Sequence, residues 1–397
     1  MTERRISTRP AWKKYLMRLC LVGTGLIAGV LIAEISLRLM HVSYPLPYVP
    51  DPYCGSRLRP GMKAEFSAEG TAWVQINQDG FRDRNHSRRK PPGTFRIAVL
   101  GDSYAEAFQV SQDETFWAIL EKKLQSNLKP GQDKVEVLNF GVSGFGTAQE
   151  LEMLRHHVWK YEPDLVLLAF MTGNDLSDNS KRLSPDGVRP YYIPQGSTLV
   201  LDQSFRQHPY YLDAQSKLSG LKVACINRFR VLQLARQKYY LARQPPLPKN
   251  PSLELGLDPI FTPPESDAWK EAWNITEQLL LRIRDEVEDH GADFWLVTLS
   301  NGVQVNPDQQ IRRSALEHLG TDDLFYADRR IEELAQREGI SAIILAPQFQ
   351  NHADKHQVYL HGFANTRLGT GHWNQNGHRL AATIIAKELS AQIGNSP

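Results

Sequence analysis

The sequence predicts an α/β protein in which helices cover both faces of a parallel sheet of about five strands, preceded by one N-terminal membrane helix. Two observations lead to the sheet. Short apolar runs alternate with segments of helical periodicity along most of the chain, and this alternation is typical of parallel sheets buried on both faces. A third observation predicts the membrane helix: a basic leader precedes an apolar stretch near the N-terminus.

Five compact apolar runs are expected to form the sheet: residues 95–100, 134–140, 163–170, 292–300 and 340–347. The spacing of apolar residues predicts helices at residues 115–124, 148–160, 267–290, 328–338 and 374–393. Consecutive strands are thus joined through helices, as parallel pairing requires.

An insertion at about 180–265 separates the third and fourth strands, and its length exceeds that of ordinary connections. Its middle, "LSGLKVACINRFRVLQLARQKYYLARQ", combines a helical apolar period with several lysines and arginines. The favoured interpretation is a solvated cationic face on a packed helical subdomain. The alternative is a surface that lies against an anionic membrane or polysaccharide.

The N-terminal segment is divided into a basic leader at 1–18, a membrane helix at 19–40 and a Pro-rich stalk with a short β segment at 41–92. Glu34 and Arg38 interrupt the apolar stretch four residues apart, so they are expected to pair or to snorkel at the membrane boundary. No convincing small-x-small cleavage site lies near Ala33 or Ser36. An uncleaved signal anchor is therefore favoured over a cleaved signal peptide and over an amphipathic core helix.

The positive-inside rule places the leader in the cytoplasm, which predicts a single-pass protein of a bacterial inner membrane with residues 93–397 in the periplasm or outside. The leader carries a net charge of +5 and the remainder −3, so nothing in the remainder favours nucleic-acid binding. Export would permit a disulfide between Cys54 and Cys225, although two ordinary buried thiols explain these residues equally well.

Polar residues that carry chemistry follow the predicted strands, where the carboxyl ends of a parallel sheet form functional sites. Ser103 follows the first strand, a loop containing Gly141, Gly144 and Gly146 follows the second, and Asn174 follows the third. His372 follows the fifth strand after a long loop. Each feature alone has a plain structural explanation, such as a helix cap or a flexible turn. Together they supply a nucleophile, donors for an oxyanion and a base, the parts needed for acyl transfer.

Four blocks in these places resemble those of the SGNH (GDSL-like) hydrolases: "GDSY", "NFGVSG", "GND" and "GHWNQNGH". The resemblance covers about residues 95–176 and the segment from 340 to the C-terminus. It implies a three-layer α/β/α flavodoxin-like fold, with Ser103 as nucleophile and His372 as base. It also implies an oxyanion hole formed by the Ser103 amide, Gly144 and Asn174.

The third member of the triad departs from the family pattern. SGNH hydrolases usually carry an aspartate three residues before the histidine, and some polysaccharide acetyltransferase relatives carry it two before. Here Gly369 and Thr370 occupy these positions. A backbone carbonyl could orient the ring instead, a distant acid such as Asp354 could do so, or the third member could be missing.

The resemblance implies a serine esterase or O-acyltransferase that acts on ester-linked acyl groups, acetyl above all, of an envelope or exported carbohydrate. The expected partners are an acylated carbohydrate or lipid ester substrate and the membrane; no cofactor and no metal ion are expected. The alternative is a non-catalytic, membrane-anchored glycan-binding or assembly module with a degenerate site. Thr370 favours that alternative, whereas the retained Ser103, Gly144, Asn174 and His372 favour the enzyme.

Overall fold

The computed structural model describes residues 11–126, 128, 133–185, 188–196, 198–243 and 258–393. The chain divides into two compact units, one of residues 1–46 and 221–244 and the other of residues 47–220 and 245–397. Part of the predicted leader (1–10) and part of the insertion (244–257) lie outside the described residues.

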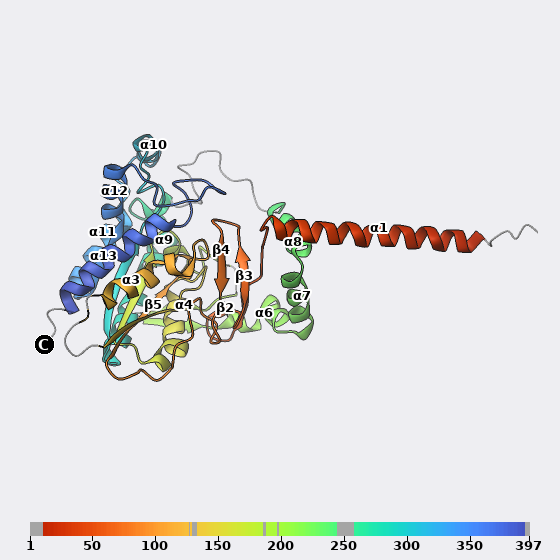
Figure 1. Ribbon diagram of the computed structural model, residues 1–397. Coiled ribbons are helices and arrows are strands. Elements are labelled where there is room, and N and C mark those ends of the chain that lie inside the picture. The colour runs from red at the N-terminus through yellow and green to blue at the C-terminus, as the bar shows by residue number, and fades with distance from the viewer. Residues whose placement is uncertain are drawn as a thin grey trace, which may run out of the picture. The chain divides into compact units, whose positions relative to one another are not determined.

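The larger unit contains a sheet with helices packed around it (Figure 1). The sheet has five parallel strands in the order β11-β10-β7-β5-β6. Its strands are β5 (Thr94–Gly101), β6 (Lys134–Asn139), β7 (Leu165–Met171), β10 (Asp293–Leu299) and β11 (Ser341–Ile344). All five correspond to runs predicted from the sequence, and the α/β fold with a parallel sheet is confirmed.

Helices cover both faces of this sheet. One face packs against α4 (Thr147–Met153), α9 (Asp267–Asp289) and α11 (Tyr326–Glu338). The other face packs against α3 (Phe116–Gln125), α12 (Leu345–His356) and α13 (Gln375–Ile393). Successive residues of β5 point to opposite faces, so Ala98 joins the first core and Val99 the second. These layers form the predicted α/β/α arrangement.

Two predicted elements end differently in the structure. The expected helix at 148–160 is regular only to Met153, and it continues as a π-helix (Leu154–Val158) and a 3₁₀ turn (Trp159–Tyr161). The expected strand at 340–347 stops at Ile344, because the apolar residues that follow it form the first turn of α12. Pro347 is tolerated there, since the first turn of a helix has no partner for its N–H.

Residues 47–92 belong to the α/β unit rather than to the extended stalk that the prolines predicted. They form two antiparallel hairpins, β1 (Tyr48–Asp51) with β2 (Gly55–Leu58) and β3 (Lys63–Phe66) with β4 (Ala72–Gln75). Leu58, Val74 and Ile76 form a small buried cluster with Phe108. The prolines thus limit helix formation in this segment without keeping it away from the core.

The described part of the insertion contributes to both units. A hairpin of β8 (Tyr191–Gln195) and β9 (Thr198–Asp202) and the helix α6 (Pro209–Ala214) belong to the α/β unit. The smaller unit contains α1 (Ala11–Leu39), most of α7 (Lys217–Arg228) and α8 (Arg230–Leu241). The remaining helices of the α/β unit are α2 (Ser103–Glu106), α5 (Asp175–Asp178) and α10 (Gln309–Leu319).

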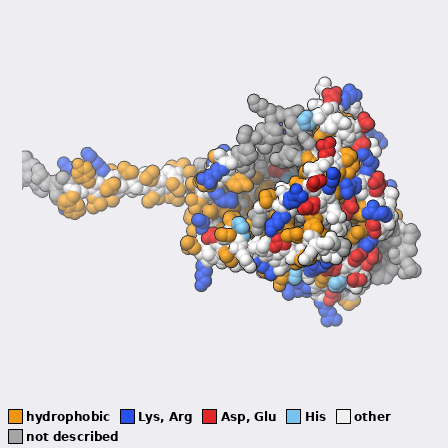
Figure 2. Space-filling view, turned by 180° about the vertical axis from the view of Figure 1, so that it is seen from behind, with side chains coloured by type: hydrophobic (Ala, Val, Ile, Leu, Met, Phe, Trp, Pro, Cys, Tyr) orange, Lys and Arg blue, Asp and Glu red, His pale blue; other side chains and the backbone are white. Residues whose placement is uncertain are grey.

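Within the smaller unit, α1 is long and apolar enough at Trp12–Leu39 to cross a membrane, judged by length and composition. Figure 2 shows apolar side chains along it. Glu34 accepts hydrogen bonds from the backbone N–H groups of Arg230 and Val231, both at 3.0 Å, at the N-terminus of α8. It also pairs with Arg38 at 2.7 Å, as the spacing predicted. Arg38 donates to the Arg228 carbonyl at the end of α7 at 2.7 Å. Glu34 therefore joins α1 to α8, and Arg38 joins it to α7.

Candidate active site

Ser103 is the first residue of α2, and only Asp102 separates it from the end of β5. The Asp102 carboxylate accepts the Tyr104 N–H at 2.9 Å and caps this short helix. The strand thus ends in a sharp turn that presents the Ser103 hydroxyl at the carboxyl edge of the sheet. Ser103 is partly exposed, whereas its neighbours on both sides are buried.

His372 reaches the same place from the loop before α13. Its Nε2 lies 2.8 Å from Ser103 Oγ, within hydrogen-bonding distance. The structure therefore brings together the two residues that the sequence predicted as nucleophile and base. Their catalytic roles remain predictions.

Glu69, in the turn between β3 and β4, supplies a carboxylate on the other side of the imidazole. Its Oε2 lies 2.5 Å from His372 Nδ1, and its Oε1 accepts the backbone N–H of His372 at 2.9 Å. A carboxylate can only accept at this position, so Nδ1 carries the proton and Nε2 faces Ser103 as an acceptor. Glu69 was not identified from the sequence.

The two sequence candidates for this third position lie elsewhere. Asp354, on α12, pairs with Arg312 at 2.8 Å, and the Thr370 hydroxyl donates to the Arg367 carbonyl at 3.0 Å. The structure thus places neither at His372 Nδ1. Asp354 lies close to His372 along the chain, whereas the residue that meets the imidazole comes from the opposite end of the α/β unit.

Gly371 explains how Glu69 can approach so closely. The glycine has a φ of +70°, and a Cβ atom added to it would lie 2.2 Å from Glu69 Oε1. Any side chain at this position would therefore displace the carboxylate. The glycine directly before His372 thus leaves the space that the Glu69 carboxylate occupies.

The charges at the site favour an ion pair. Burial lowers the pKa of His372, but the hydrogen bond and the charge of Glu69, together with Asp102 and Glu106, raise it above its ordinary value of 6.5 overall. For Glu69, burial raises the pKa, but the hydrogen bonds and charge of His372 lower it below the ordinary value of 4.5 overall. The pair therefore stabilises the imidazolium that general-base catalysis by His372 would generate.

A buried network holds the loop that carries His372. His361 donates from Nδ1 to the Gly371 carbonyl at 2.7 Å, and the Tyr104 hydroxyl donates to the same carbonyl at 3.1 Å. On its other side, His361 Nε2 accepts from Ser300 Oγ at 2.9 Å, and that oxygen accepts from the Trp373 indole at 2.9 Å. Burial lowers the pKa of His361 to about 4, so this histidine is neutral near pH 7.

The predicted oxyanion donors lie on the expected loops. Ser143 N donates to Glu106 at 2.8 Å, which fastens the loop after β6 to α2. Gly144, the next residue, has a φ of +75° and open space where a Cβ would stand. Asn174 follows β7, and its side-chain amide donates a hydrogen bond to Asp178 at 3.4 Å. The assignment of Gly144 and Asn174 as oxyanion donors remains a prediction.

Glu106 is a second acid near His372 that the sequence did not identify. Its carboxylate accepts from the Tyr48 hydroxyl at 2.8 Å as well as from Ser143 N. Burial raises the pKa of Glu106 to about 7, although both of these hydrogen bonds lower it. It ties the N-terminal segment, α2 and the loop after β6 to one another.

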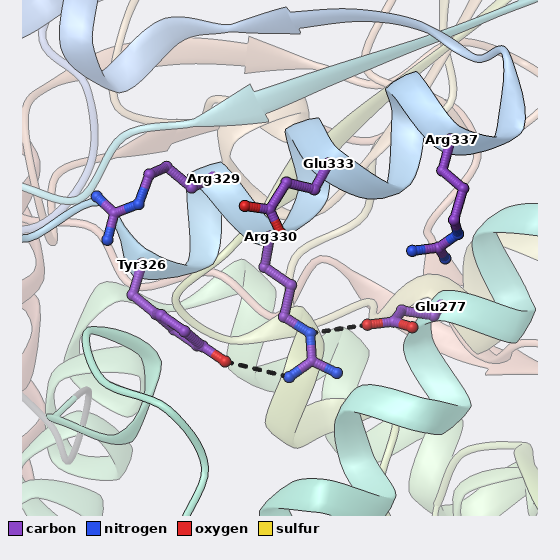
Figure 3. A pocket seen from close by; sticks show the side chains of 6 residues that line it. All are labelled: Glu277, Tyr326, Arg329, Arg330, Glu333 and Arg337. Carbon is purple, nitrogen blue, oxygen red and sulfur yellow. Dashed lines mark hydrogen bonds and ion pairs between the residues drawn. The ribbon is translucent and has the colours of Figure 1, made fainter.

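A hollow of about 490 Å³ lies away from these residues, between α9 and α11 (Figure 3). Six residues line it: Glu277, Tyr326, Arg329, Arg330, Glu333 and Arg337. Arg330 bonds to Glu277 at 2.8 Å and to the Tyr326 hydroxyl at 3.2 Å, while Arg329 and Arg337 pair with Asp323 and Glu338. Protein carboxylates therefore balance each guanidinium, and the hollow is best explained as an ion-paired surface.

No known protein-family profile matches the chain, and no curated protein matches it. Among solved structures, the chain is similar to the acetyl xylan esterase AlAXEase, with 13% identity, a TM-score of 0.39 and coverage of 74% of this chain and 100% of that one. It is similar to a catalytic mutant of Axe2, an acetylxylan esterase from Geobacillus stearothermophilus (13%, 0.38, 76% and 96%). It is also similar to the lipase/acylhydrolase from Enterococcus faecalis (13%, 0.36, 75% and 96%).

Proposed function

We propose that this protein is a serine acyl hydrolase or O-acyltransferase that forms an acyl-enzyme on Ser103. The observation that carries the proposal is the continuous chain from Glu69 through His372 to Ser103, with contacts of 2.5 Å and 2.8 Å. An acid, an imidazole and a hydroxyl linked in this order have the geometry of a nucleophile activated by an oriented base.

In the proposed mechanism, His372 Nε2 takes the proton from Ser103 Oγ as the oxygen attacks the ester carbonyl. Glu69 holds Nδ1–H in place and stabilises the imidazolium. The Ser103 amide, Gly144 and Asn174 stabilise the developing oxyanion. The imidazolium then returns its proton to the leaving alkoxide, and water or an acceptor hydroxyl, deprotonated by His372, releases the acyl group from Ser103.

The proposed substrate is an acylated carbohydrate of the cell envelope or an exported carbohydrate, with acetyl the favoured acyl group. Two features support this choice: the resemblance of four sequence blocks to the SGNH hydrolases, some of whose membrane-tethered members acetylate exported polysaccharides, and the apolar helix α1. In this proposal, α1 anchors the protein in a bacterial inner membrane and residues 93–397 act outside the cytoplasm. Hydrolysis and transfer use the same residues and differ in whether water or a sugar hydroxyl accepts the acyl group.

The test is hydrolysis of p-nitrophenyl acetate by the full chain in detergent, compared between wild type and Ser103→Ala. We expect kcat/KM to fall by about 10⁴-fold or more, as removal of a triad nucleophile does. A fluorophosphonate probe should label wild type and leave Ser103→Ala unlabelled. Ser126→Ala, at an exposed serine after α3, is the matched control and should keep full activity and labelling.

Equal hydrolysis by wild type and Ser103→Ala would reject the enzyme proposal. So would the absence of both hydrolysis and labelling in a folded wild-type protein, and that result would favour the non-catalytic glycan-binding module. Given activity, incubation with an acetyl donor and an unacetylated oligosaccharide distinguishes the two enzymes. Acetylated oligosaccharide indicates a transferase, whereas release of acetate alone indicates a hydrolase.

A further inference from the structure

Three potential metal ligands from separate parts of the α/β unit meet beside the β1–β2 turn. They are Asp51 at the end of β1, Cys54 in the turn, and His157 in the π-helix. One ligand atom from each residue lies within 4.8 Å of the other two. The exposed fraction is 2% for Asp51 and 0% for Cys54, so the group is built into the protein rather than scattered on its surface.

Local hydrogen bonds hold Asp51 and Cys54 in place. Asp51 Oδ1 accepts the backbone N–H groups of Tyr53 at 2.8 Å and Cys54 at 2.9 Å, which fixes the turn and occupies only one carboxylate oxygen. The Gln149 side chain donates to the Cys54 carbonyl at 2.8 Å and fastens the turn to α4. The site is therefore formed by the fold before any ion binds.

The π-helix determines the direction of His157. His156 stacks on Tyr53 with ring centroids 3.5 Å apart, and the next residue, His157, faces Asp51. π-helical turns are rare, and they occur frequently at functional sites. A regular α-helix continued through this segment, as the sequence predicted, would present these two histidines differently.

The remaining contacts of the ligand atoms are long or poorly aligned. The Cys54 thiol donates to the Gln149 carbonyl at 3.8 Å, a bond that a metal-bound thiolate would give up. His157 Nε2 lies 3.2 Å from Asp51 Oδ2, yet among the described residues this buried nitrogen has no partner in hydrogen-bonding geometry. Arg57 approaches the same oxygen only to 3.7 Å, which is too long for a hydrogen bond. The nitrogen and the oxygen are close to each other but are not directed at each other, as expected for two ligands aimed at one shared point.

We infer that Asp51, Cys54 and His157 bind one zinc ion. Oxygen, thiolate and imidazole ligands suit Zn²⁺, whose bonds of about 2.0–2.3 Å place tetrahedral ligands roughly 3.3–3.7 Å apart. Small side-chain movements bring the three atoms to that separation. The fourth position goes to water, which enters past the His157 side chain, itself 14% exposed.

This zinc ion fastens the N-terminal segment to the helical layer at α4. The same segment continues into the β3–β4 turn that carries Glu69, so zinc supports the position of that residue from a distance. The inference concerns a site apart from Ser103 and His372. Metal binding by Ser103→Ala therefore tests it independently of the proposed activity.

The experiment is a Co²⁺ titration of the metal-free full chain in detergent, followed by zinc competition. Wild type and Ser103→Ala should bind one Co²⁺ per chain with a thiolate-to-cobalt charge-transfer band that zinc abolishes. Cys54→Ser should lose this band, and zinc affinity should fall by about 100-fold or more in Cys54→Ser and in His157→Gln. Cys225→Ser is the matched control, since Cys225 is exposed on α7, and it should retain the band.

Thermal unfolding gives a second measurement if Cys54→Ser folds poorly. Zinc should raise the unfolding midpoint of wild type and of Cys225→Ser, and should leave that of His157→Gln unchanged. No saturable band in wild type would overturn the inference. A band or a zinc-induced stabilisation that persists in Cys54→Ser and His157→Gln would do so as well.

Discussion

At His372, one carboxylate fixes both the ring and the backbone of the proposed base. Glu69 Oε2 meets Nδ1, and Glu69 Oε1 accepts the His372 N–H. The contact to the backbone N–H fixes the position of the carboxylate relative to the main chain of His372. The contact to Nδ1 then restrains the ring, because rotation of the imidazole would break it. Loss of this carboxylate should therefore affect both the orientation and the basicity of the imidazole.

Glu69→Gln is expected to lower kcat/KM by up to about 10⁴-fold, because a neutral amide stabilises the imidazolium poorly and can favour the wrong tautomer. The base must be neutral to act, and the pKa of His372 is raised above 6.5, so activity of the wild type should rise with pH through a value above 6.5. Without the Glu69 charge the pKa of His372 falls, so this rise in activity, the acid limb of the profile, should occur at lower pH. The measurement is the pH profile of kcat/KM.

Asp354→Asn is the matched control for that profile, since it neutralises the acid that the sequence favoured. Its ion pair with Arg312 joins α12 to α10 and does not contact His372, so the rise of activity with pH should occur where it does in wild type. An acid limb that moves in Asp354→Asn but not in Glu69→Gln would refute the assignment of Glu69.

Gly371→Ala tests the space that the Glu69 carboxylate occupies. The added methyl group would lie 2.2 Å from Glu69 Oε1, so the carboxylate must move, and kcat/KM should fall by about 10²-fold or more. Gly320→Ala is the matched control: its φ is +63°, and nothing lies within 4 Å of the added methyl group. Both variants incur the left-handed backbone cost of about 1–2 kcal/mol, but only Gly371→Ala should lose activity. Equal activity in the two variants at similar unfolding midpoints would contradict this explanation.

The sequence identified Ser103 and His372 because each lies in a short block with a recognisable pattern, Ser103 directly at the end of an apolar strand. Glu69 has no such signal. It is 303 residues from His372 along the chain, and its neighbours "SAEGTA" are typical of any exposed turn. Glu69 meets His372 only because the β3–β4 hairpin folds against the rest of the α/β unit. The local periodicity of a sequence does not reveal a contact between residues so far apart.

At the scale of elements, the β3–β4 hairpin is the part that completes the candidate triad, and Asn365 holds its turn. Gly70 N donates to Asn365 Oδ1 at 2.9 Å, and Asn365 Nδ2 donates to the carbonyls of Gly70 at 2.8 Å and Ser67 at 3.2 Å. The side chain thus links the turn that carries Glu69 to the loop that leads to His372.

Asn365→Ala should therefore loosen the hairpin turn and lower kcat/KM by about 10-fold to 100-fold, since displacements near 1 Å are costly in catalysis. Fluorophosphonate labelling should become slower without being lost, because Ser103 and His372 remain in place. Asn85→Ala is the matched control, because the Asn85 amide also accepts a turn N–H, that of Gln78 at 3.0 Å, at a distance from the triad. Similar losses in the two variants would show that Asn365 acts only through general stability.

The sequence predicts best those strands and helices that are long and buried on a defined face, because their apolar residues must then recur at regular intervals. The five strands and the long helices α9, α11 and α13 pack on a continuous core, so apolar residues recur at regular intervals. The strands β1 to β4 have four residues each, too few to establish a period. The prolines at 45, 47, 50, 52 and 60 therefore favour a stalk with one short β segment, whereas the structure forms two hairpins.

At the scale of the whole α/β unit, buried carboxylates gather at the edge of the sheet that carries Ser103. Burial raises the pKa of Asp102 to about 6, and it raises the pKa values of Glu150 and Asp175 well above the ordinary range, with repulsion among these acids adding to the effect. Both carboxylate oxygens of Glu150 lack a hydrogen-bond partner among the described residues. The fold therefore favours the protonated form of Glu150.

A pKa raised in the folded state fixes the sign of the pH dependence. Above the ordinary value of 4.5, the unfolded chain loses the Glu150 proton while the folded protein keeps it, so the free energy of unfolding falls as pH rises until the folded pKa is reached. Each such proton contributes about 1.4 kcal/mol per pH unit. Glu150→Gln removes this proton and lessens the repulsion on Asp175, so its stability should decline less steeply than that of wild type between about pH 5 and 8.

Denaturant unfolding of the full chain at several pH values measures these slopes, with Glu317→Gln as the matched control on the exposed surface of α10. The control should follow wild type, because its side chain is solvated in both states. At pH 8 the Glu150→Gln variant should have a higher free energy of unfolding than wild type. The two proteins should differ least near pH 5, where the protonated Glu150 of wild type and the glutamine of the variant are both neutral. Parallel curves for wild type and Glu150→Gln would show that Glu150 is already ionised in the folded protein, and the sheet edge beneath Ser103 would then carry a negative charge that the proposed oxyanion site must overcome.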